Sequence, residues 1–157
     1  MKPTSFDYAS VIRMYAYKKF GVALGKTQVL KLLYMLYGMY LSQTGNKLFE
    51  DDEIRAWTFG PVCPNVYYRF NQDAPYKVDD DIVAEICKDK TASQLIINIV
   101  TKRCRWSAIQ LVRWTHEYNS PWYKTVYGEN GSKPASVWGG VISDDDIKKY
   151  FENFKLA

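Results

Sequence analysis

The sequence predicts a mainly α-helical fold: one domain over residues 1–157, with about seven helices around a central hydrophobic helix (27–43) and a small β-hairpin near 54–78. Three observations support this prediction. Residues 27–43 are apolar on almost every side, apolar residues elsewhere recur mainly at helical spacing, and residues 54–59 alternate with the period of a strand. A chain of 157 residues is long enough for a single domain with a substantial core.

The chain before the central helix predicts one further helix. Thr4 and Asp7 have the spacing of a capping box, and Gly21 can end the helix. Tyr8 and Ile12 lie on the same face of it, as the spacing of four residues requires. This face is expected to pack on the core.

The central helix is predicted between Thr27, whose hydroxyl can cap the first turn, and Gly45, which can end the last one. Its apolar side chains leave one narrow polar stripe formed by Lys31, Gly38 and Ser42. A helix that is apolar on nearly all sides is a membrane span or the centre of a core. A span needs roughly 18 or more apolar residues without charge, and Lys31 and Gly38 interrupt the run before that length. We therefore expect other helices to surround this one.

A β-hairpin is predicted after the central helix. Residues 54–59 alternate as a short strand does, and Gly60-Pro61 is a turn signal. A second strand around residues 76–78 is expected to pair back on the first. Between the two, Pro64 fits the first turn of a short helix.

Capping residues followed by apolar side chains at helical spacing predict the remaining helices. These helices are expected to begin near residues 79–81, Thr91, Ser107, Ser120 and Ser143. The segment after Thr91 is rich in β-branched residues, so a strand is the alternative there. Residues 128–141 are rich in Gly, Ser and Pro and are expected to form a loop.

Composition and charge argue against several classes of function. The net charge of +4 is spread along the chain, whereas nucleic-acid-binding proteins usually concentrate basic residues on one face. The three cysteines are far apart and lack metal-binding spacing, so we expect no disulfide framework, metal site or other cofactor. The N-terminus has no apolar signal segment, which favours a cytoplasmic protein without a membrane partner.

No catalytic residue is assigned, and we expect a protein that is not an enzyme. His116 is the only histidine, and no nucleophile or second partner stands at a meaningful spacing from it. A structural histidine near a helix C-terminus is the favoured interpretation, with a general base as the alternative. Aromatic residues make up 16% of the chain, including 13 Tyr and 5 Trp, which favours a binding surface.

Four clusters occur in order along the chain: KLLYMLYGMYL, AWTFGPVCPNVY, LVRWTHEYNSPW and ISDDDIKKYF. Together they resemble the Panacea domain, an antitoxin domain also called SocA-like, over about residues 6–154. The motif residues that carry the resemblance, and that we expect to be mainly structural, are Trp57, Gly60, Pro61, Val62, Pro64, Tyr67, Thr115, His116, Pro121 and Trp122.

The resemblance implies the antitoxin of a two-gene toxin–antitoxin module, of a kind often found on phages and prophages. Such a protein neutralises a cognate protein toxin, encoded by an adjacent gene, through direct protein–protein binding. One relative instead acts as an adaptor that delivers its toxin to a protease, and this is the first alternative. A nucleic-acid-binding regulator is the alternative of another class.

The loop of residues 128–141 is the predicted toxin-binding element, because loops of this length in compact domains are often binding elements. Tyr127, Lys133 and Trp138 are the residues expected to flank the contact. Trp138 has two interpretations, a buried anchor of the loop or an exposed anchor for the toxin.

Overall fold

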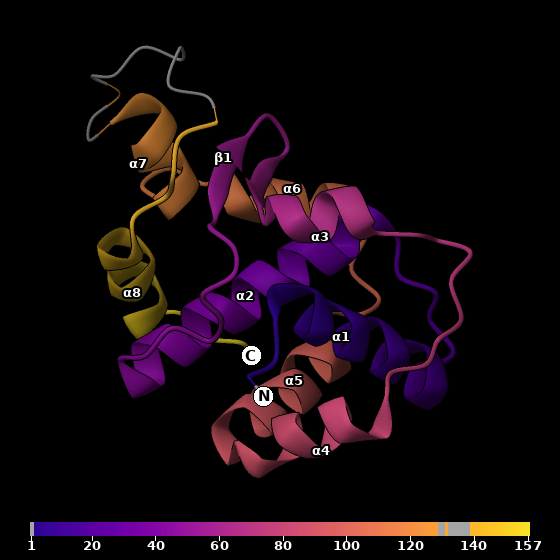
Figure 1. Cartoon of the computed structure of the whole chain (residues 1–157). Helices are drawn as coiled ribbons and strands as arrows, with labels where there is room; N and C mark the ends of the chain where they lie inside the picture. The colour runs from indigo at the N-terminus through magenta and orange to yellow at the C-terminus, as the bar shows by residue number, and fades with distance from the viewer. Residues whose placement is uncertain (1, 129–130, 132–138) are drawn as a thin grey trace.

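The computed structural model describes residues 2–128, 131 and 139–157 (Figure 1). These residues form eight helices and one two-stranded antiparallel sheet, which confirms the predicted fold class. The elements are α1 (Ser5–Phe20), α2 (Lys26–Thr44), β1 (Arg55–Trp57), β2 (Gly60–Val62), α3 (Pro64–Arg69), α4 (Asp80–Lys88), α5 (Lys90–Arg103), α6 (Ala108–Thr115), α7 (Pro121–Tyr127) and α8 (Asp144–Glu152). None of the helices within the described ranges is long and apolar enough to cross a membrane.

The predicted central helix is present as α2, against which α1, α5, α6 and α8 pack (Figure 1). Gly45 ends it in a left-handed conformation, as predicted. Its beginning differs, because Gly25 rather than Thr27 is the N-cap. The Gln28 side chain accepts a hydrogen bond from the Gly25 N–H at 2.8 Å and donates to the Trp106 carbonyl at 2.9 Å. A tertiary contact therefore sets the start of the helix.

The predicted polar stripe of α2 is not a solvent-facing one. Lys31 and Gly38 are both buried, and Ser42 is half-buried. The ring of Phe151, from α8, lies directly on Gly38, so that a methyl group at this position would overlap the ring. Glycine is required here by close packing between two helices.

The hairpin has a different second strand from the predicted one. β1 pairs with β2 in the register Arg55 with Val62, Ala56 with Pro61 and Trp57 with Gly60. Gly60-Pro61 is therefore part of a strand, and the turn is formed by the two residues before it. Pro61 fits because Ala56 directs its own N–H and carbonyl to residues 139–140 on the other side.

Residues 76–78, predicted as the second strand, lead instead into α4. Tyr76 stacks on Tyr17 of α1, with 3.8 Å between ring centroids. The start of α5 also differs, since Asp89 caps it by accepting from the Ala92 N–H at 3.1 Å, where a cap at Thr91 was expected. The segment is helical, so the strand alternative is wrong. The capping predictions at Thr4, Ser107, Ser120 and Ser143 are confirmed.

Candidate functional site

Side chains from three helices hold the backbone of the hairpin. Trp122, on α7, donates from Nε1 to the Trp57 carbonyl at 2.8 Å. His116, at the end of α6, places Nε2 3.0 Å from the Thr58 carbonyl oxygen. Lys31, on α2, donates from Nζ to the Pro61 carbonyl at 3.0 Å. The two motif clusters that lie far apart in the sequence therefore meet at this hairpin, and its turn is held in one position.

Gly60 occupies a position that only glycine fits. Its φ of 114° lies in the region that side-chain-bearing residues rarely adopt. A Cβ atom would also lie 2.6 Å from Oγ1 of Thr115, which donates to the Val112 carbonyl at 2.7 Å. The motif residues Gly60 and Thr115 are thus neighbours, and their contact packs the hairpin closely against α6.

His116 has backbone carbonyls at both ring nitrogens. Nδ1 lies 2.7 Å from the Val112 carbonyl oxygen, and Nε2 faces the Thr58 carbonyl described above. The ring also packs on Trp122, with 3.7 Å between centroids. A general base needs a ring nitrogen that can reach a substrate proton, so this arrangement supports the structural interpretation of His116.

The hairpin and α3 present a cluster of aromatic side chains, Trp57, Phe59, Tyr67 and Tyr68, which we call the aromatic platform. The exposed fractions are 69% for Phe59 and 75% for Tyr68. Ring centroids are 4.9 Å apart for Trp57 and Tyr67, and 5.3 Å apart for Tyr67 and Tyr68. Apolar patches formed by several neighbouring side chains mark interaction sites more often than single exposed apolar residues do.

Lys31, like Phe59 and Tyr68, is a residue of this site that the sequence did not single out. It is only 1% exposed, although it was predicted on a polar stripe. Burial lowers the pKa of its ammonium to about 8. Within the part of the chain that the structure describes, no carboxylate forms an ion pair with it. The sequence does contain a signal for its special position, because Lys31 is the one charged residue between Val29 and Leu41.

The burial of Lys31 predicts a specific pH dependence of stability. The pKa of Lys31 is about 8 in the folded chain and 10.5 when unperturbed. Between these two pH values the unfolded chain therefore binds more protons than the folded chain. The free energy of unfolding should therefore rise with pH, by about 2 kcal/mol from about pH 7 to about pH 9.5. Urea unfolding of the wild-type chain and of Lys31→Met at several pH values isolates this contribution as the difference between them. Parallel pH profiles for the two proteins would contradict it.

The remaining motif residues lie within or beside the same region. Val62 and Pro121 are buried, and Pro64 begins α3. Tyr127, predicted to contact the toxin, is the half-buried last residue of α7 and packs near Trp122, with 6.1 Å between ring centroids. Lys133 and Trp138, the other two predicted contact residues, lie outside the described residues, and their roles stay predictions.

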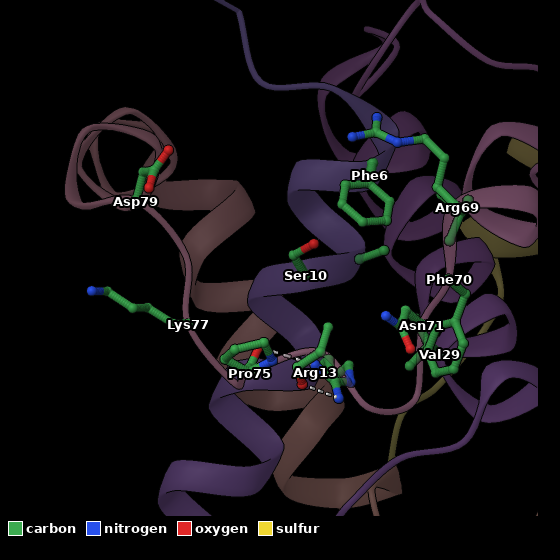
Figure 2. A pocket seen from close by; sticks show the side chains of 13 residues that line it. Phe6, Ser10, Arg13, Val29, Arg69, Phe70, Asn71, Pro75, Lys77 and Asp79 are labelled. Carbon is green, nitrogen blue, oxygen red and sulfur yellow. Dashed lines mark hydrogen bonds between the residues drawn. The ribbon is translucent and has the colours of Figure 1, made fainter.

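A pocket of about 400 Å³ lies along α1, away from the hairpin (Figure 2). At the edge of this pocket, the guanidinium of Arg13 donates to the carbonyls of Gln72, Ala74 and Pro75, at 2.8 to 3.3 Å. It also lies 4.0 Å from the centroid of the Tyr76 ring, while its buried Nε has no partner among the described residues. Arg13 thus ties the segment between α3 and α4 to α1, which is a structural role.

Comparison with known proteins agrees with the resemblance drawn from the motifs. The family model described as "Antitoxin SocA-like, Panacea domain" matches residues 29–123, which include the hairpin, α3 and the residues that hold them. Antitoxin SocA of Caulobacter vibrioides (strain NA1000 / CB15N) is 29% identical over 168 aligned positions, which cover 99% of this chain and 87% of that protein. No solved structure matches. The chain belongs to the SocA-like antitoxin family, and its Panacea domain contains the aromatic platform and the hairpin that presents it.

Proposed function

We propose that this chain is the antitoxin of a two-gene module and that it neutralises the toxin encoded beside it by binding it directly. Membership of the antitoxin family supports the role in general. The observation that supports direct binding is the aromatic platform, on which Phe59 and Tyr68 are mostly exposed. Tyrosine and other large aromatic residues are enriched in the cores of protein–protein interfaces.

The platform has a second property that a tight interface requires. Its hairpin is held by hydrogen bonds from Lys31 and Trp122 and by the close approach of His116. A surface that is already ordered loses little conformational entropy on binding, so more of its contact energy contributes to affinity. The net charge of +4 further suggests that fit of shape and local contacts, rather than overall acidity, govern recognition.

The proposed activity needs no catalysis. The chain's only histidine has backbone carbonyls at both ring nitrogens. An antitoxin that covers the active surface of its toxin acts through affinity alone, and we infer that this chain works in that way.

Replacing the exposed rings of the platform should weaken toxin binding without unfolding the antitoxin. Phe59→Ala and Tyr68→Ala are each expected to lower affinity for the product of the adjacent gene by about 2 kcal/mol, or about 30-fold. Because both rings are mostly exposed, melting temperatures should hardly change. Co-purification, calorimetry and rescue of growth on co-expression measure these effects.

Ile97→Ala is the matched control, since Ile97 is also exposed, at 41%, but lies on α5. Figure 1 shows α5 at the opposite end of the molecule from the hairpin. Unchanged affinity of Phe59→Ala and Tyr68→Ala would exclude the platform as the contact. A wild-type chain that never associates with the toxin, but rescues growth only when a protease is present, would favour the adaptor function.

A further inference from the structure

The space between α2, the hairpin and α3 is a pocket of about 460 Å³ with Lys31 in its wall. The other residues that line it are mostly apolar: Thr27, Leu30, Trp57, Thr58, Phe59, Val62, Tyr67 and Gly139. Three members of the aromatic platform, Trp57, Phe59 and Tyr67, thus border a pocket that the buried Lys31 also lines. The pocket is continuous with the surface proposed to bind the toxin.

The ammonium of Lys31 is incompletely satisfied by the described residues. An ammonium carries three N–H donors, and the described part of the chain gives one acceptor for them, the Pro61 carbonyl at 3.0 Å. Across residues 2–128, 131 and 139–157 no carboxylate pairs with it. A buried charge without a counter-ion is unfavourable, and an anion placed beside it in apolar surroundings is bound more strongly than in water.

Among the described residues, the titratable and charged groups nearest the pocket do not supply that anion. Cys63 follows β2, and burial raises the pKa of its thiol well above the usual value, so the thiol stays neutral. The ring of Tyr67 has the ammonium of Lys26 at 4.0 Å from its centroid, so this neighbour adds a cation and not an anion. His116 faces the carbonyl of Thr58 on the neighbouring side. The charge that complements Lys31 must come from outside these groups.

We propose that this pocket binds a carboxylate side chain of the toxin, an Asp or Glu flanked by apolar residues, with Lys31 as its counter-ion. The apolar neighbours would lie on Phe59 and Tyr67, while the carboxylate reaches the ammonium between α2 and the hairpin. The inference rests on the proposed function, because it assigns the pocket's occupant to the toxin. It gives the toxin-binding face a specific chemical requirement, an acidic residue within an apolar patch.

A small probe tests the chemistry of the pocket without the toxin. Hydrocinnamate, an aromatic carboxylate, and hydrocinnamamide, its neutral amide, are titrated into the full chain while the indole N–H signal of Trp57 is followed by NMR. The carboxylate should produce a saturable shift at pH 7 and bind at least ten times more tightly than the amide. Its affinity should fall about tenfold per pH unit above about pH 8, where Lys31 loses its proton.

Lys31→Met should abolish the preference for the carboxylate. Lys102→Met, which removes the same charge from an exposed position on α5, should retain it. Equal binding of acid and amide to the wild-type chain would overturn the proposal, as would a carboxylate preference that survives in Lys31→Met. If Lys31→Met does not fold, the comparison of acid and amide and its pH profile on the wild-type chain decide the matter.

The toxin itself gives the second arm of the test. Folded Lys31→Met should bind it at least tenfold more weakly than the wild-type chain, whereas Lys102→Met should bind it normally. Full affinity in Lys31→Met would show that the toxin does not use the pocket. Failure of the wild-type chain to bind the toxin would instead refute the proposed function, and with it the toxin as occupant, whatever the probe shows.

Discussion

Leu33→Asp is expected to abolish folding. Leu33 lies in the middle of α2, is 0% exposed and belongs to the helix around which α1, α5, α6 and α8 are packed. The substitution removes a buried leucine and places a carboxylate where no solvent reaches it. An unpaired buried charge costs several kcal/mol, and a domain of this size is stable by only about 5–15 kcal/mol. The variant should be insoluble or should lack a cooperative unfolding transition.

Two controls separate the effect of burial from that of the helix. Leu33→Met conserves volume and polarity and should cost less than about 1.5 kcal/mol. Gln43→Asp introduces the same charge at an exposed position near the end of α2 and should leave the chain folded. Circular dichroism and urea unfolding distinguish these results. A soluble Leu33→Asp protein that unfolds cooperatively would show that α2 is not the centre of the core.

Gly38→Ala is expected to destabilise the chain by about 3 kcal/mol, although alanine is the better helix former by about 1 kcal/mol. The added methyl group would overlap the ring of Phe151. That ring has little freedom to move, because it packs against Tyr34 at 5.4 Å and Phe154 at 5.2 Å between centroids. Either α8 shifts away from α2 or the ring leaves its position, and both disrupt the core.

A double-mutant cycle checks this explanation. Phe151→Leu removes the ring and is destabilising by itself, but Gly38→Ala should cost much less in that background than in the wild-type chain. Urea unfolding of the four proteins gives the coupling energy. A Gly38→Ala protein that is more stable than the wild type would show that helix propensity outweighs the contact and that α8 does not pack closely on Gly38.

Features that depend on neighbours in the chain could be predicted from the sequence. The apolar circumference of residues 27–43 indicated a buried helix before any contact was known, and Gly45 indicated its end. The same holds for the caps at Ser107 and Ser120, where a side chain bonds to a backbone N–H three residues later. These interactions span a single turn, so spacing alone specifies them.

The candidate site depended on long-range contacts and could be predicted only in part. The motif residues were recognised from their order, but nothing in that order shows that Trp122 and His116 meet the hairpin at Trp57 and Thr58. Loop length points to Tyr127, Lys133 and Trp138 as contact residues. It carries no information on Phe59 and Tyr68, whose exposure depends on how the hairpin and α3 pack.

Most of the helices, and the position of the buried one, follow from the sequence alone, because the periods and caps that specify them are local. The partner of β1, the close contact of Gly38 with Phe151 and the burial of Lys31 become visible only in the folded chain. Each depends on which segments distant in the chain come together. A lysine on an apolar helix can extend to water or remain beneath a hairpin, and the hairpin that covers Lys31 begins more than twenty residues later.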